Sequence, residues 1–352
     1  MYCTKIIYKN YRNIETAEIE PVKGVNVFYG DNAQGKTNLL EGIYYFACGK
    51  SFRAAKDREL IRFGEENSSV TLNFTDSVRE REHKIIFSQT ERKACFKEGI
   101  KINRMSEFIG SFRAVLFSPE HLSIVKDGPS ERRAFLDVAI SQLYPVYMSS
   151  LSKYQKILMQ RNACIKDREN GYFSEDMFRV LSEQLAKEAA LISAYREKYV
   201  LKLSEYVGDI ISDMTCGKEK AELIYAGRRD EKEYLDCLTL NTDKEFRAGV
   251  TLYGPHKDDI TITLNGKDSR SFASQGQQRS IALSMKLSEG EISREITGEY
   301  PVFLFDDILS ELDRSRKDYV LSGLDNRQVI ITCCEDIPKG HIFGVSSGSV
   351  TV

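Results

Sequence analysis

Residues 25–45 read VNVFYGDNAQGKTNLLEGIYY, and this stretch decides the fold. The run 25–29 is apolar with β-branched and aromatic residues, which predicts a buried strand, whereas the run after Thr37 has helical apolar spacing. Residues 30–37 match G-x-x-x-x-G-K-[ST] without deviation, on the strand-to-helix turn that this phosphate-binding motif requires. The alternative interpretation is a chance glycine-rich turn before a structural helix.

The residue types in this turn suit a nucleoside triphosphate. Gly30 and Gly35 let the backbone wrap around a phosphate, whose charge is met by amides and by the helix N-terminus. Lys36 is expected to reach the β- and γ-phosphates and to assist catalysis, and the Thr37 hydroxyl is expected to ligate Mg²⁺. We therefore predict ATP and Mg²⁺ as cofactors. The predicted nucleotide-binding residues of the turn are Gly30, Asp31, Asn32, Ala33, Gln34, Gly35, Lys36 and Thr37.

Length and composition limit the class of protein. At 352 residues the chain exceeds one typical domain, which favours two lobes or one domain with a large insertion. With 41% hydrophobic and 29% charged residues it has the composition of a soluble globular protein, and no apolar run approaches the roughly 18 residues that span a membrane. The start, MYCTK, lacks a signal peptide's apolar core, and the 8 cysteines form no C-x-x-C pair. These features predict a cytoplasmic protein with reduced thiols and no membrane contact.

The overall charge is nearly balanced. A formal charge of −2 lacks the basic signature of a dedicated nucleic-acid coat protein, so any contact with DNA must use local patches. The candidate patches are Lys50 to Arg53 with Lys56 and Arg58, the pair Arg132-Arg133, and the pair Arg228-Arg229. The alternative for each is an ordinary solvated face.

The chain order predicts three segments. Residues 1–128 form the first part of an ATPase lobe, with a hairpin turning near Asn13 and strands at 70–74, 84–87 and 114–117. Residues 129–244 form a helical arm lobe, because apolar stripes over 136–158 and 181–203 flank a turn at Asn170-Gly171. Pro145 is expected to kink the first of these helices. Residues 245–352 complete the ATPase lobe. Two ordinary core helices remain the alternative to an arm.

A second motif supplies carboxylates. Residues 302–307 read VFLFDD, a buried-strand run that delivers two aspartates at its end. Asp306 is placed like a Walker B aspartate that holds Mg²⁺, and Asp307 is placed to polarise an attacking water as a catalytic residue. The alternative is a strand ending in a solvated turn.

A third motif points to a class of ATPase. Residues 274–279, SQGQQR, open a helix and resemble the S-G-G-Q signature of ABC-type ATPases, with Ser274, Gly276 and Gln277 as predicted nucleotide contacts. An ordinary Ser/Gly helix cap would look similar. Residues 310–313, SELD, follow the Walker B run and resemble the D-loop of the same class. In that class two heads enclose two ATPs, each bound by one subunit's P-loop and the other subunit's signature serine.

Several blocks together resemble the bacterial RecF family of SMC/ABC-type ATPases. They are NYRN at 10–13, the P-loop through Glu41, GKSFR at 49–53, FSPE at 117–120, GPHKDD at 254–259 and the signature. The blocks keep the family's order over essentially the whole chain. Departures include Lys257 in place of the usual arginine, Thr332-Cys333-Cys334 in the switch region, and no evident Q-loop glutamine.

The resemblance implies an α/β fold: a P-loop NTPase of ABC/SMC-head type with mixed β-sheets, plus an inserted helical lobe. It also implies an ATP-dependent homodimer that binds single-stranded and duplex DNA at gap junctions and hydrolyses ATP slowly. The family acts in recombinational repair and replication-fork maintenance, supporting RecA loading and SOS induction with RecO and RecR as partners. The alternatives are the ATPase subunit of a membrane transporter and a small-molecule kinase. The kinase would need neither the signature nor the D-loop.

Overall fold

The computed structural model describes residues 1–168, 172–309, 312–323, 326–334 and 340–351. The chain divides into two compact units. Unit 1 comprises Met1–Leu122, Asp213–Cys216 and Ala282–Val352, and unit 2 comprises Ser123–Ser212 and Gly217–Ile281. This division differs from the three predicted segments in one main respect, because residues 245–281 belong with the helical unit rather than with the ATPase lobe.

The described residues contain the following elements. The strands are β1 (Tyr2–Tyr11), β2 (Ile14–Ile19), β3 (Val25–Tyr29), β4 (Asn67–Thr75), β5 (Glu80–Ser88), β6 (Ala94–Lys97), β7 (Ile100–Ile102), β8 (Ala114–Phe117), β9 (Ala221–Tyr225), β10 (Ile260–Leu264), β11 (Lys267–Asp268), β12 (Val302–Asp306), β13 (Val329–Cys333), β14 (His341–Ser346) and β15 (Ser349–Thr351). The α-helices are α1 (Lys36–Cys48), α2 (Met105–Phe108), α3 (Ser123–Lys126), α4 (Pro129–Leu143), α5 (Pro145–Asp167), α6 (Glu175–Met214), α7 (Glu231–Leu240), α8 (Thr242–Ala248), α9 (Ser269–Phe272), α10 (Gln275–Thr297) and α11 (Arg314–Ser322), and the 3-10 turns are η1 (Asp57–Leu60) and η2 (Pro119–Leu122).

Unit 1 contains an antiparallel sheet in the order β2-β1-β4-β5-β6-β7. The predicted opening hairpin is confirmed, with Tyr11 paired to Ile14 across the turn at Asn13. Buried and more accessible residues alternate along β4 and β5, so that one face of these strands packs on the core. The strands predicted at 70–74 and 84–87 lie within these two longer elements.

The second sheet of unit 1 is mostly parallel, in the order β15-β14-β3-β13-β12-β8. Strands β8, β12 and β13 are buried at every position, as expected for parallel strands covered on both faces. Since β3, β13 and β12 run in the same direction, the turn after β3 and the aspartates at the end of β12 emerge at one edge.

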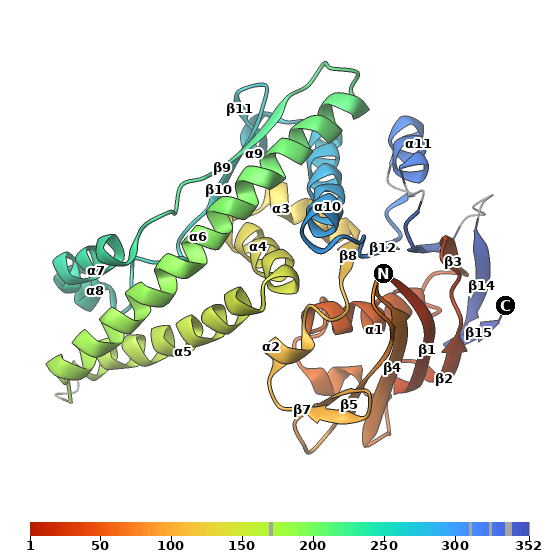
Figure 1. Ribbon diagram of the computed structural model, residues 1–352, viewed down its shortest axis with the longest axis horizontal. Helices are drawn as coiled ribbons and strands as arrows, with labels where there is room; N and C mark the ends of the chain where they lie inside the picture. Colours follow the sequence, from red (N-terminus) through yellow and green to blue (C-terminus); the bar gives the residue numbers. More distant parts are fainter. Residues whose placement is uncertain (169–171, 310–311, 324–325, 335–339, 352) are drawn as a thin grey trace. The chain divides into compact units, whose positions relative to one another are not determined.

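Helix α1 contacts strands of both sheets, namely β8, β12 and β13 on one side and β4 on the other. Figure 1 shows α1 in the red part of the chain, near β4. The approach to the antiparallel sheet is close: the Tyr8 hydroxyl donates to the Leu39 carbonyl at 2.5 Å. A Cβ on Gly42 would lie 2.5 Å from the Tyr8 ring, so this contact requires glycine. The helix that follows the phosphate-binding turn is therefore held on two faces.

The first long helix predicted for unit 2 is broken rather than kinked. Helix α4 ends at Leu143 and α5 begins at Pro145, and Tyr144 between them is extended, with φ −130° and ψ 97°. A residue that precedes proline is disfavoured in the helical region by a steric clash with the proline ring. The prediction of one continuous kinked helix was therefore wrong, although its position and apolar stripe were right.

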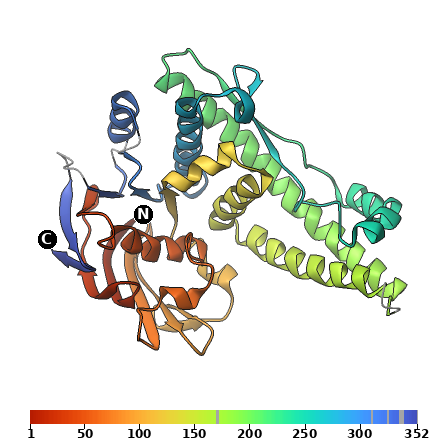
Figure 2. The same cartoon turned by 180° about the vertical axis from the view of Figure 1, so that it is seen from behind.

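Helices α5 and α6 run antiparallel, as the two stripes predict. Arg161 on α5 donates to Ser182 on α6 at 3.0 Å, and nearer the start of α5 Tyr147 accepts from Arg196 at 3.1 Å. The turn predicted at Asn170-Gly171 lies outside the described residues. Beside this helix pair, α8 contacts α5, and Figure 2 shows α7 and α8 together near the end of α5.

A small sheet completes unit 2, in the order β11-β10-β9. The predicted Asn265-Gly266 turn joins β10 to β11, and both residues have positive φ, at 50° and 75°. These values are typical of a type I′ hairpin turn. Within the described ranges, no helix combines the length and apolarity needed to cross a lipid bilayer.

The core of unit 1 contains a histidine that should make folding sensitive to pH. His83 is only 1% exposed between Phe74 and Phe108, and burial, with the nearby Lys97 and Arg81 charges, lowers its pKa from 6.5 to about 3. Below pH 6.5 the unfolded chain therefore binds a proton that the folded chain rejects, and stability falls as the pH is lowered. At one pH unit below 6.5 this histidine costs about 1.4 kcal/mol.

We expect His83→Phe to remove that part of the pH dependence, because the ring fills the same space and the replaced Nδ1 has no hydrogen-bond partner. The measurement is the urea unfolding free energy at pH 7.5 and 5.5 for both proteins. An equal loss of stability in the two would show that His83 does not contribute.

Candidate nucleotide-binding site

The predicted phosphate-binding turn lies between β3 and α1 and has a strained backbone suited to its shape. Gly35 has φ 111° as the N-cap of α1, and Ala33 has φ 63°. A Cβ on Gly30 would lie 2.2 Å from the Val345 carbonyl oxygen of β14, which leaves no room for any other residue. Both motif glycines are therefore required by the surrounding chain and by the backbone conformation, independently of any phosphate.

Two neighbouring segments brace the turn. The Asn13 side chain donates to the Gln34 carbonyl at 3.1 Å, and its Oδ1 accepts from Asn38 on α1 at 2.8 Å. From the β14–β15 turn, the Gly348 amide donates to the same Gln34 carbonyl at 2.9 Å, and the Ser347 amide donates to the Gln34 side-chain oxygen at 2.6 Å. The loop is thus preorganised around Gln34.

Lys36 lies folded under the turn and is only 5% exposed. Its ammonium donates to the carbonyl oxygens of Gly30 at 2.5 Å and Asp31 at 2.9 Å, and it lies 3.1 Å from the Cys334 sulfur. Cys334 also contacts the Asn32 side chain at 3.0 Å. The lysine charge is therefore held at the centre of the loop, where it faces the space that the turn encloses.

The Walker A and Walker B segments meet at a hydroxyl–carboxylate contact. Thr37 donates to Asp306 Oδ1 at 2.9 Å, and Thr332 at the end of β13 donates to the same oxygen at 2.8 Å. Asp306 is 6% exposed, and this burial raises its pKa against the lowering effect of the two hydroxyls. A hydroxyl and a carboxylate in contact are hard oxygen ligands of the kind that Mg²⁺ prefers, so the residues present fit that ion.

Asp307 follows with an unusual backbone conformation. Its φ is 54°, in the left-handed region, and its amide donates to the Thr332 hydroxyl at 2.9 Å. The residue is half-buried. The structure thus brings together the predicted residues 30–37, Asp306 and Asp307 at one edge of the parallel sheet.

Ser274, Gly276 and Gln277 belong to unit 2 and are described within it. The Ser274 hydroxyl accepts from the Gln277 amide at 3.3 Å, and the Gln277 side chain accepts from the Ser274 amide at 2.8 Å. This reciprocal pair is a capping box at the start of α10. Gln277 also donates to Glu219 at 2.8 Å, while Ser274 is exposed. The helix-cap interpretation of this motif is therefore present in the structure, and it leaves the serine at the surface.

The D-loop residues are described only in part. Ser310 and Glu311 lie outside the described residues. Leu312 is buried, and Asp313 is the N-cap of α11, where its side chain accepts from the Arg316 amide at 2.9 Å. The role predicted for this loop therefore stays a prediction.

Sequence reasoning assigned no role to two residues that shape the site: Asn13, which holds the turn, and Thr332, which donates to Asp306. Gln34 was predicted as a nucleotide contact, and it also receives the β14–β15 turn. Asn13 stands in the quoted NYRN block, and Thr332 is a hydroxyl at the end of a buried strand, so each carried a signal. The β14–β15 turn carried no such signal in the sequence, since no motif marks it.

One residue of the predicted Arg132-Arg133 patch is buried, whereas Arg133 is partly exposed. Arg132 is 5% exposed, and its guanidinium makes two hydrogen bonds to Asp259, at 2.7 and 2.9 Å. It also donates to the carbonyls of Ile124 and Asp127. These contacts occupy its donors, so Arg132 was wrongly proposed as a free cation.

Comparisons with known proteins extend over the whole chain. Residues 2–337 match the family described as RecF/RecN/SMC N terminal domain. The DNA replication and repair protein RecF of Clostridium beijerinckii is 42% identical over 364 residues, covering 99% of this chain and 98% of that protein. Its counterpart in Clostridium kluyveri is 39% identical over 363 residues, with 100% of both covered.

Comparisons with solved structures agree with the family match. A structure of the recombination mediator protein RecF-ATP in the RecFOR pathway has a TM-score of 0.93 at 36% identity, covering 99% of this chain and 97% of that one. An Smc head domain from Pyrococcus furiosus has a TM-score of 0.59 at 17% identity, a likeness of fold alone. The fold and the phosphate-binding turn are those of a P-loop NTPase of ABC/SMC-head type with an inserted helical lobe. The chain belongs to the RecF family of DNA replication and repair proteins.

Proposed function

We propose that this chain is an ATP-dependent DNA-binding protein of recombinational repair, in which nucleotide binding drives dimerisation on DNA. The observation that carries the proposal is the Thr37–Asp306 hydrogen bond of 2.9 Å, because it joins the phosphate-binding helix to the carboxylate strand. The relatives named as recombination mediator and repair proteins support it. The same relatives disfavour a transporter ATPase subunit, and the proposed setting is the cytoplasm.

Nucleotide binding is assigned to the turn. The amides of residues 30–37 and the N-terminus of α1 would receive the phosphates, and the Lys36 ammonium would exchange its carbonyl contacts for phosphate oxygens. Thr37 and Asp306 would hold Mg²⁺, which when bound neutralises phosphate charge. Ser274, Gly276 and Gln277 would contact the nucleotide held by a second copy of the chain.

Hydrolysis is assigned to Asp307. Its backbone is fixed by the Thr332 hydroxyl, so its carboxylate is held near the phosphate-binding turn to accept a proton from water. An aspartate side chain is one methylene shorter than a glutamate and demands closer placement of that water. We therefore expect slow turnover, consistent with hydrolysis that resets a switch rather than one that drives a metabolic reaction.

The proposed partners are DNA, RecO and RecR. One solved relative is named as part of the RecFOR pathway, which supports RecO and RecR as partners of this chain by family membership. For DNA the proposed contact is the basic patch, defined as Lys50, Arg53 and Lys56. Lys50, Arg53 and Lys56 are all exposed, and Arg53 donates to Asn38 on α1 at 3.1 Å. The patch is thus attached to the phosphate-binding helix by a side-chain contact.

DNA affinity should rise with ATP, and so should its dependence on salt. Each phosphate neutralised by a cation releases counterions, so doubling the patch by dimerisation roughly doubles the slope of log affinity against log salt. We expect a variant with alanine in place of Lys50, Arg53 and Lys56 to have a lower DNA affinity and a smaller salt slope, with dimerisation unaltered. The measurement is filter binding of gapped, duplex and single-stranded DNA over a salt series, with and without ATP.

A matched control replaces the exposed cations Lys9, Lys101 and Arg104, which removes the same charge elsewhere in unit 1. An ATP-independent slope would mean that dimerisation does not build the DNA site. If both triple variants lost DNA affinity equally, the basic patch would contribute no more to DNA binding than any other exposed cations.

A further inference from the structure

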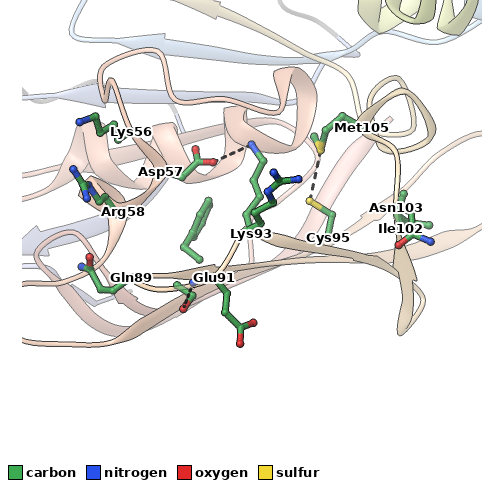
Figure 3. A pocket seen from close by; sticks show the side chains of 13 residues that line it. Lys56, Asp57, Arg58, Gln89, Glu91, Lys93, Cys95, Ile102, Asn103 and Met105 are labelled. Carbon is green, nitrogen blue, oxygen red and sulfur yellow. Dashed lines mark hydrogen bonds and ion pairs between the residues drawn. The ribbon is translucent and has the colours of Figure 1, made fainter. Parts of the chain in front are cut away.

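Unit 1 contains a pocket that shares only Lys56 with the residues to which the proposed function assigns a role. Its volume is about 480 Å³, within the range of small-molecule sites, and it is formed by η1, the ends of β5 and β7, and the segment entering β6. Figure 3 shows Lys56 and Arg58 on one side of this pocket and Cys95, Ile102 and Met105 on the other. The lining also contains two carboxylates, Glu91 and the Asp57 that pairs with Lys93. One side is therefore mainly cationic, and the other is apolar.

The pocket is separate from the phosphate-binding turn. Lys93, which lines it, donates to the carbonyl of Gly49 at 2.7 Å, and Gly49 is the residue that caps the C-terminal end of α1. The turn is at the opposite end of this 13-residue helix, which at 1.5 Å per residue is about 20 Å away. A ligand here would thus not compete with a nucleotide at Lys36.

Three cations around the pocket have no assigned partner. Lys93 is engaged, because it forms an ion pair with Asp57 at 3.1 Å and donates to the Tyr45 hydroxyl at 2.5 Å. For Lys56, Arg58 and Arg92, by contrast, no side-chain hydrogen bond or ion pair is found within the described part of the chain. Uncompensated cations of this kind around a concave site attract an anion.

The apolar side offers the partly exposed side chains of Ile102 and Met105 to a flat ring. The other two apolar lining residues, Phe87 and Cys95, are buried, at 1% and 3% exposed. The Phe87 ring makes an edge contact with Tyr45 at 5.0 Å between centroids, and the Cys95 sulfur lies 3.8 Å from that of Met105. Sulfur and aromatic groups are polarisable and pack well against aromatic rings. Gln89 and Asn103 at the rim offer both donors and acceptors.

We propose that this pocket binds one nucleotide unit, with its base against Ile102 and Met105 and its phosphate against Arg58, Arg92 and Lys56. A base with its sugar and phosphate needs an apolar surface, polar groups at its edge and nearby cations, and this pocket is lined by all three kinds of group. The unit has two sources, a free nucleotide or one nucleotide of a strand. This site goes beyond ATP binding at the turn and does not depend on it.

The test is calorimetric titration with AMP, and separately with a four-residue thymidine oligonucleotide, into protein loaded with one equivalent of ATPγS and with Mg²⁺. One equivalent fills the turn and leaves no excess triphosphate to compete at the pocket, so the added ligand reports the second site. We expect binding by at least one probe, and at least a tenfold loss of affinity in Arg58→Ala/Arg92→Ala. Lys56 is left in place because it belongs to the basic patch. Gln89→Trp, which blocks the mouth from an exposed position, should give a similar loss.

The matched control is Lys101→Ala/Arg104→Ala, two exposed cations beside Ile102 and Asn103 that do not line the pocket. Binding of AMP alone identifies a free nucleotide, and binding of the oligonucleotide alone identifies a strand. The proposal is overturned if neither probe binds, if both pocket variants bind as well as the parent, or if the control loses as much affinity. ATPγS binding in the first step tests the proposed nucleotide function independently.

Discussion

Lys36→Ala is expected to abolish the rise in melting temperature that ATP and Mg²⁺ produce. A ligand at about a hundred times its dissociation constant stabilises the folded state by about 2.7 kcal/mol, and this gain disappears when the site no longer binds. The reason is that Lys36 is 5% exposed and its ammonium lies at the Gly30 and Asp31 carbonyls, within the turn that is expected to bind the phosphates. The measurement is thermal unfolding with and without nucleotide.

Lys36 also stabilises the turn itself, so its effect on the stability of the free protein must be separated from its effect on ATP binding. Its removal leaves the carbonyls of Gly30 and Asp31 without the ammonium, so the melting temperature without ATP is expected to fall as well. The informative quantity is the shift caused by ATP in each protein. Lys9→Ala, at an exposed position on β1, is the control and should keep the full shift. A Lys36→Ala protein that also kept the full ATP-induced shift in melting temperature would contradict the assignment of the turn.

The fold around the turn was predictable because local signals agreed. The apolar run 25–29, the glycines and the helical spacing after Thr37 each predict one part of a single β-turn-α unit, and the structure has β3, the turn and α1 in those places. The carboxylates were predictable for the same reason, since the four apolar residues before Asp306 predict a buried strand, which the structure has as β12. At these positions the local sequence pattern and the tertiary structure require the same residue types.

The features that could not be predicted from the sequence depend on contacts between residues far apart in the chain. The β14–β15 turn reaches Gln34 from more than 300 residues along the chain, and no local pattern reports such a pairing. Arg132 shows the reverse error: a charged pair in the sequence suggests a surface patch, but Asp259, 127 residues away, buries the guanidinium in an ion pair. Charge is visible in a sequence, whereas the partner that neutralises it is not.

The interrupted helix at Tyr144 is an intermediate case. Pro145 was recognised, and a proline inside a helix can give either a kink or a new helix start. The structure has the second, with Pro145 as the first residue of α5 and Tyr144 extended before it. The apolar stripe alone does not distinguish the two, because both leave the same residues on the buried side.

Ser274→Arg is expected to block ATP-driven dimerisation while leaving nucleotide binding to the single chain intact. Ser274 is exposed at the start of α10, where an arginine would place bulk and positive charge at the proposed contact with the second copy's nucleotide. Asp307→Asn should have the opposite effect and prolong the dimer, because the amide cannot accept a proton from water. Sedimentation velocity with ATP and Mg²⁺ measures both effects.

The loss of the helix cap has to be distinguished from the loss of the dimer. Removing the Ser274 hydroxyl takes away its bond from the Gln277 amide, which costs about 1 kcal/mol of stability whether or not a dimer exists. Ser274→Asn keeps a capping side chain and so reports the contribution of the serine itself. Ser271→Arg, at an exposed position on α9, adds the same charge and bulk close by and should still dimerise. If Ser274→Arg dimerises with ATP as the parent does, two heads do not enclose the nucleotide at this serine, and its role is to cap α10.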